Sequence, residues 1–151
     1  YYHDTIGVNS RLDSIQAAVL DAKLPHLDEY IEARQKAAAY YDEAFKNNSH
    51  ILIPTRAANS THVFHQYTLR LIEVDREALR NALAEAGIPA MIYYPVPLHM
   101  QKAYQDSRYK EGDFPVAERL ANCVLSLPMH TELDEEQLAY ITQNVLKALN
   151  T

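Results

Sequence analysis

The strongest constraint on the fold is a long helical region, from about Ser10 to Lys46, that contains one proline. Apolar residues recur at helical spacing on both sides of Pro25, and the alanines between them favour helix. Pro25 lacks a backbone donor and crowds the preceding turn, so we expect a kink there. Ser10 is expected to cap the start of the helix. We also expect the apolar side of this helix to be exposed in the isolated chain and to drive association.

Short apolar segments and helices alternate after this region. Strands are predicted at 62–71, 88–94 and 124–127, where branched and aromatic residues cluster. Helices are predicted at 75–86, 99–104, 114–122 and from 134 to the end of the chain. Three strands are too few for a doubly wound enzyme. The expected fold class is therefore α/β, with a small three-stranded sheet and helices on one face.

Charge and composition exclude several classes of protein. Net charge is −6, from 14 Lys+Arg and 20 Asp+Glu, which argues against nucleic acid as a partner. The single cysteine, Cys123, has no internal partner for a disulfide, and we expect a buried thiol. No apolar stretch reaches the ~20 residues of a bilayer span, so we expect a cytoplasmic protein. The chain begins at Tyr1 and not at methionine, which we interpret as a sign of an excised or processed piece.

No self-sufficient catalytic set is apparent in the sequence. With only three glycines, neither a nucleophile elbow nor a glycine-rich phosphate loop can be written. His62 and His65 lie three apart in a predicted strand and would point to opposite faces, so we interpret them as structural and expect no metal site.

Two segments are more informative. The first, residues 7–18, enters a helix and displays an amide, a hydroxyl and a guanidinium from Asn9, Ser10 and Arg11. A helix start with such donors suits an anion, but ordinary capping would give the same pattern. The second, residues 87–99, delivers aromatic and imidazole groups onto a rigid proline-bound turn. Rigid turns suit ligand contact, yet a purely structural turn would look alike.

These two segments, in this order, resemble the DegT/DnrJ/StrS family of sugar-nucleotide aminotransferases. Further motifs extend the likeness over essentially the whole chain. They are Leu24-Pro25-His26-Leu27 with Arg34, Phe64-His65-Gln66-Tyr67, Tyr94-Pro95-Val96-Pro97-Leu98-His99 with Gln101, Phe114-Pro115-Val116-Ala117-Glu118 and Leu125-Ser126-Leu127-Pro128. The resemblance implies the C-terminal small domain of a fold-type I enzyme that uses pyridoxal 5'-phosphate (PLP). Residues 1–46 would be an interface loop and long connecting helix, residues 47–151 the small α/β domain, and the N-terminal PLP-binding domain would be absent.

The resemblance also implies function and partners. Family members form homodimers with shared active sites and move an amino group, usually from glutamate, to a nucleotide-linked keto sugar. Asn9 matches a residue that reaches the cofactor phosphate of the other subunit, with Arg11 beside it. Tyr94 and His99 match the region that lines the sugar-nucleotide pocket. Tyr93 stands where members often carry histidine, so this chain has no imidazole at that position.

The resemblance assigns no catalytic residue to this chain, because none of its six lysines lies in the family's cofactor-binding motif. Schiff-base chemistry needs a positioned amine, so the chain alone is expected to be inactive. Two alternatives stay open. One is a PLP-dependent sugar dehydratase of the same family, in which a histidine replaces the lysine. The other is a non-catalytic dimerisation or binding domain.

Overall fold

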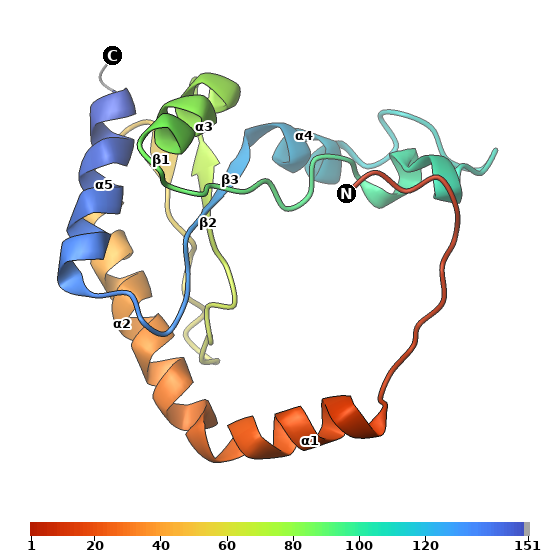
Figure 1. Cartoon of the computed structure of the whole chain (residues 1–151). Helices are drawn as coiled ribbons and strands as arrows, with labels where there is room; N and C mark the ends of the chain where they lie inside the picture. Colours follow the sequence, from red (N-terminus) through yellow and green to blue (C-terminus); the bar gives the residue numbers. More distant parts are fainter. Residues whose placement is uncertain (150–151) are drawn as a thin grey trace.

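The computed structural model describes residues 1–149 and shows a small α/β domain with a helical arm (Figure 1). Strands β1 (Ile51–Leu52), β2 (Tyr67–Leu71) and β3 (Val124–Leu127) form one antiparallel sheet in the order β1-β2-β3. The helices are α1 (Ser14–Lys23), α2 (Leu27–Phe45), α3 (Arg76–Glu85), α4 (Pro115–Cys123) and α5 (Glu135–Leu149). Three short 3-10 turns lie at Leu24–His26, Leu98–Met100 and Lys102–Tyr104. The predicted α/β class with a three-stranded sheet is confirmed.

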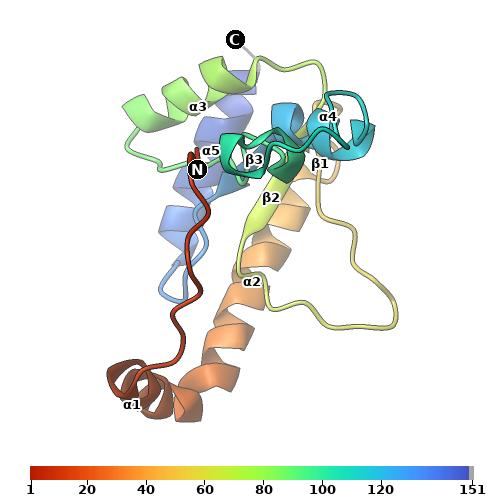
Figure 2. The same ribbon diagram turned by 90° about the vertical axis from the view of Figure 1, so that its right-hand side faces the viewer.

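The core lies between the sheet and its helices. Tyr67, Leu69 and Leu71 of β2 are buried while Arg70 between them is exposed, as expected for a sheet that covers the core with one face. Figure 2 shows α2 and α5 together on one side of the sheet. The second half of α2 contributes Ala37, Ala38, Tyr41 and Phe45 to this core. The packed body therefore begins within α2.

The helical region has the predicted kink but starts later than predicted. The 3-10 turn at Leu24–His26 contains Pro25 and joins α1 to α2 at a sharp angle (Figure 1). Asp13, not Ser10, is the N-cap: its carboxylate accepts the amide of Gln16 at 2.8 Å, and Gln16 Oε1 accepts the amide of Asp13 at 3.3 Å. An acid followed three residues later by an amide closes this reciprocal pair. Ser10 has no such partner and stays on an exposed segment.

Two strand predictions were wrong in extent. The predicted strand at 62–71 is reduced to Tyr67–Leu71, because Phe64 takes a positive φ of 47° and Arg34 occupies the carbonyls of Phe64 and His65. The predicted strand at 88–94 is reduced to one bridge between Met91 and Ser126. Pro89 has no amide to donate to a ladder, so pairing cannot extend through it. The sheet reaches three strands because β1 pairs with β2 instead.

Local signals elsewhere were reliable. Asp75 caps α3, Gly87 follows it with φ of 74°, and Asp134 with Gln137 forms the capping box of α5.

Two other predictions were wrong. The predicted helix at 99–104 is instead two 3-10 turns, because Gln101 between them is extended. Cys123 ends α4 and is only half-buried, so the prediction of a buried thiol was wrong.

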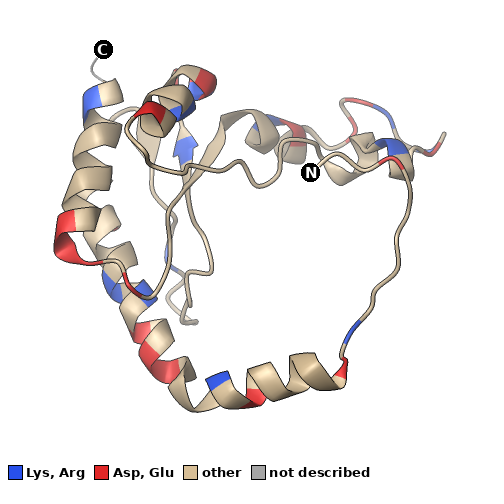
Figure 3. Ribbon diagram, viewed as in Figure 1, with Lys and Arg blue, Asp and Glu red and all other residues tan. Residues whose placement is uncertain are grey.

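α1 and the segment before it stand away from the packed body. None of the residues of α1 is buried, although most are apolar. Figure 3 shows that few charged residues interrupt this helix. The extended segment 1–13 runs from α1 back to the turns at 98–104, so the first residues lie beside a part of the chain about a hundred positions away (Figure 1).

Candidate functional site

A cavity of about 560 Å³ lies between the first residues of the chain, the turn at 93–101 and α4. Val96, Pro97 and Leu98 form its apolar floor with side chains of α4, and Tyr94 and Gln101 bring polar groups to it. A cavity of this size, with few polar groups on an apolar wall, is typical of a site for a small organic ligand.

Three tyrosines converge at this cavity. The ring of Tyr1 lies edge-on to Tyr93 and Tyr94, with centroids 5.5 and 5.4 Å away. A hydrogen bond with Tyr93, followed by burial, raises the pKa of the Tyr1 phenol above its ordinary value of 10.0, so the group is protonated at neutral pH. Tyr94 remains 59% exposed, so its ring is free to contact a ligand. The structure thus places the predicted residue Tyr94 on the cavity wall.

Gln101 ties the first residues to the turn, a role that sequence reasoning missed. Its side chain accepts the amide of His3 at 3.0 Å and donates to the carbonyl of Tyr1 at 2.8 Å. Gln101 is buried, with 6% of its surface exposed. The motif that contains Gln101 gives no sign of this role, because its partners lie at the other end of the chain.

His99 lies away from Tyr94. Its Nε2 is 2.9 Å from Glu118 Oε1, its ring centroid is 4.7 Å from that of Phe114, and its side chain is only 8% exposed. Burial works against ionisation of Glu118, but the amides of Gly112 and Phe114 together with His99 outweigh it and lower the pKa of that carboxyl. His99 lines a neighbouring cavity of about 470 Å³, and its contact with Glu118 ties the turn at Leu98–Met100 to α4. Its predicted role in binding substrate stays a prediction.

Asn9 and Arg11 lie on the exposed segment that leads into α1. Within residues 1–149 neither side chain has a hydrogen-bond or ion-pair partner. Neither residue lines the cavity beside Tyr94. Their amide and guanidinium are exposed and could bind an anion.

His62 has structural contacts within the chain. The Nδ1 atom of His62 accepts the amide of Phe64 at 2.8 Å, and the two rings lie 4.4 Å apart. Residues 1–149 contain no group of three or more histidine, cysteine or acidic side chains placed to hold a metal ion. In the same range, no helix has the length and apolar character that a membrane span needs.

The fold and the cavity together define a small α/β domain with a candidate ligand site and an exposed apolar helix. Comparison with known proteins identifies the family of this domain. The model of the DegT/DnrJ/EryC1/StrS aminotransferase family matches residues 1–146, and the chain belongs to this family.

Curated relatives match nearly the whole chain. A pleiotropic regulatory protein from Geobacillus stearothermophilus is 45% identical over 147 residues, which are 96% of this chain and 39% of the relative. A UDP-N-acetyl-3-dehydro-alpha-D-glucosamine 3-aminotransferase from Acidithiobacillus ferrooxidans is 43% identical over 99% of this chain and 39% of the relative. The chain thus spans about 39% of the length of these relatives.

Solved structures of similar fold also match nearly the whole chain. DesV from S. venezuelae is 38% identical with a TM-score of 0.84, covering 97% of this chain and 39% of that one. A family aminotransferase from Brucella abortus is 40% identical with a TM-score of 0.81, over 94% of this chain and 37% of that one. The fold is that of the C-terminal small domain of fold-type I PLP-dependent aminotransferases.

Proposed function

We propose that the protein carrying this chain is a PLP-dependent aminotransferase that moves an amino group from glutamate to a nucleotide-linked keto sugar. Family membership carries the proposal, together with relatives named for amino transfer on UDP-linked and dTDP-linked sugars. The aromatic cavity beside Tyr94 supports it, because aromatic rings and a few polar groups suit a sugar nucleotide.

The residues of this chain fit a binding role and not the chemical step. PLP, when bound, supplies the electron sink for amino transfer. Asn9 and Arg11 offer donors that suit its phosphate, in the other subunit of a homodimer. Tyr94 lines the sugar pocket, and His99 with Glu118 holds the loop below it.

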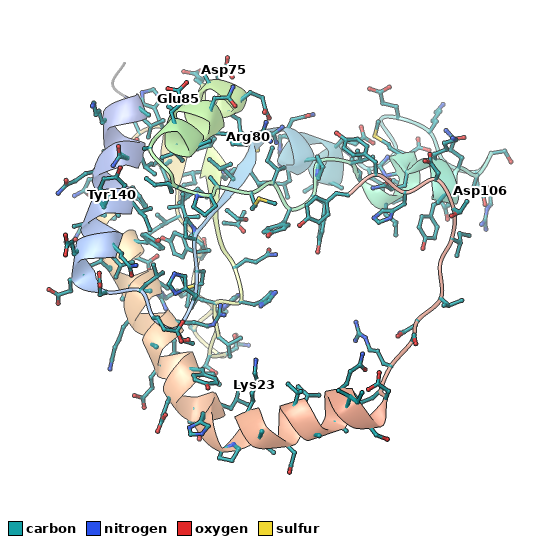
Figure 4. All side chains as sticks on the ribbon, in the orientation of Figure 1. Lys23, Asp75, Arg80, Glu85, Asp106 and Tyr140 are labelled. Atoms are coloured by element: carbon teal, nitrogen blue, oxygen red, sulfur yellow. The ribbon has the colours of Figure 1, made fainter. Side chains whose placement is uncertain are left out.

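The lysines of this chain do not supply the cofactor's amine. Lys46 pairs with Glu43 and Lys102 with Asp4, both at the surface. Lys23 extends from α1 toward the packed body but lies in no cavity wall described above (Figure 4). The chain alone therefore has no transaminase activity. A pyridoxyl group fixed by reduction and mapped to one of these lysines would overturn that statement.

Family membership also supports a domain organisation for this chain. Residues 1–46 form the interface loop and connecting helix, and residues 47–151 form the small domain. A PLP-binding domain outside this chain covers one side of α1, and the second subunit of a homodimer covers the other. The uncovered apolar surface of α1 supports this arrangement. The enzyme is cytoplasmic and uses no metal.

There are two alternative functions. A family dehydratase would use the same sugar pocket but replace the cofactor-binding lysine with histidine. A non-catalytic binding or dimerisation protein is favoured by one observation, the regulatory name of the relative from Geobacillus.

The test uses the protein from the complete reading frame, supplied with PLP, glutamate and a UDP-linked or dTDP-linked 3-keto sugar. Mass spectrometry should find the amino sugar and 2-oxoglutarate in equal amounts. Tyr94→Ala should raise KM about tenfold, because losing a stacked ring costs about 1–3 kcal/mol, whereas Tyr140→Phe on α5 should not. Loss of water without amination would support the dehydratase, and no conversion at all would support the non-catalytic alternative.

A further inference from the structure

We infer that Gln101 is a positioning residue that clamps the first residues of the chain onto the 94–104 turn and so sets the shape of the cavity beside Tyr94. The inference rests on the proposed function for the identity of the ligand. The clamp itself is a property of this chain.

Both the oxygen and the nitrogen of the Gln101 side-chain amide form hydrogen bonds. Oε1 accepts the amide of His3 at 3.0 Å, and Nε2 donates to the carbonyls of Tyr1 at 2.8 Å and Val96 at 3.4 Å. A backbone bond from Ala103 to the carbonyl of His3, at 2.9 Å, lies alongside. Residues 1–3 are therefore held to the turn through their backbone, whatever their side chains contact.

Only a glutamine side chain meets all of these demands. It must accept from an amide on one side and donate to two carbonyls on the other, which also fixes the orientation of its amide. Glutamate would place a carboxylate against the carbonyls of Tyr1 and Val96, and asparagine is one methylene shorter. In residues 1–149 no buried side-chain nitrogen or oxygen lacks a partner, so the clamp is fully satisfied. Removing it leaves the amide of His3 without its acceptor.

The clamp has two consequences for the site. It fixes the backbone of Tyr1, and with it the ring that lies against Tyr93 and Tyr94 on the cavity wall. The same segment then runs on to Asn9 and Arg11, so Gln101 also anchors one end of the arm that carries these two donors. The ring of Tyr1 and the donors of Asn9 and Arg11 must be held in place for a ligand to be oriented.

Gln101→Met tests the clamp in the full chain, because methionine fills a similar volume without the hydrogen bonds. Gln105→Met is the matched control, since Gln105 is an exposed residue directly after the turn whose side chain makes no hydrogen bond within residues 1–149. Hydrogen exchange by NMR should show the amides of His3 and Ala103 exchanging at least about tenfold faster in Gln101→Met, because they open locally. The Tyr1 phenol should also titrate closer to its ordinary value, since its hydrogen bond with Tyr93 is loosened.

The core provides the decisive comparison. Amides of Leu69 and Leu125 in the sheet should keep their protection in both variants. Unchanged exchange at His3 in Gln101→Met would overturn the clamp. Loss of protection in the sheet as well would show that Gln101 supports the whole fold and has no specific positioning role.

The complete enzyme separates this inference from the proposed function. Gln101→Met should raise KM for the nucleotide-linked sugar about tenfold and leave kcat nearly unchanged, with Gln105→Met like the wild type. An unchanged KM beside faster exchange at His3 would refute the role of the clamp in binding, while the proposed function stands. A wild-type enzyme without amination would refute the proposed function, and the exchange and titration results would still decide the clamp.

Discussion

The exposed apolar surface of α1 leads to a quantitative prediction about association. Ile15 and Val19 form one apolar stripe, and Leu20 and Leu24 form a second on the other side of the helix, because residues four apart lie on the same side. Each of these side chains is at least half exposed. A helix that is apolar on both sides is typical of a helix that is covered on both sides. We therefore predict that the isolated chain associates and that Val19→Glu suppresses association.

The magnitude follows from the exposed side chains. Full burial of an aliphatic side chain contributes about 1.5–3 kcal/mol, so each half-exposed one offers about 1 kcal/mol when it is covered. Ile6, Val8, Leu12 and Leu27 are similarly exposed, which gives about 8 kcal/mol per copy and about 16 kcal/mol for a symmetric pair. Association costs about 9 kcal/mol in the middle of its range, and the remaining ~7 kcal/mol corresponds to a Kd on the order of 10 µM. A carboxylate in each copy costs at least about 2 kcal/mol, which weakens the pair about a thousandfold.

Sedimentation velocity between about 1 and 300 µM brackets this Kd. The wild type should shift from monomer to larger species, while Val19→Glu should stay monomeric. Ser14→Glu is the control, because it adds the same charge to the polar side of the same helix. A wild-type chain that is monomeric throughout, with little binding of a hydrophobic dye, would contradict the prediction. So would a Val19→Glu chain that associates as the wild type does.

Three further predictions concern stability. Leu83→Ala should lower the free energy of unfolding by about 2–5 kcal/mol in urea denaturation, because Leu83 is fully buried; a loss below about 1 kcal/mol would contradict the described core. Tyr41→Phe should cost about 1 kcal/mol, because its hydroxyl donates to the carbonyl of Pro128 at 2.9 Å, and an unchanged Tm would argue against that bond. The lowered pKa of Glu118 contributes stability that is present above its ordinary value of 4.5 and is lost as pH falls through the folded value. Glu118→Gln should therefore flatten the acid side of the stability curve, and an identical curve would refute this.

The elements that sequence reasoning placed correctly are those decided by neighbours in the chain. Asp75 and Gly87 bound α3, and Asp134 pairs with Gln137 within one helical turn. The kink at Pro25 needs only the ring of the proline. The errors lie where distant residues decide. Arg34 takes the carbonyls that a strand at 62–66 would have used.

The same division holds for the candidate site. Local sequence is enough to predict the rigid proline-bound turn and to place Tyr94 on it, because prolines restrict the backbone locally. The contact of His99 with Glu118 and that of Tyr94 with Tyr1 depend on the folded chain, because these partners are distant in sequence. It alone revealed Gln101, whose partners lie about a hundred residues away. Hydrogen bonds between distant segments cannot be predicted from the spacing of neighbouring residues. A buried side-chain amide that joins two distant segments is therefore recognised only in the folded chain.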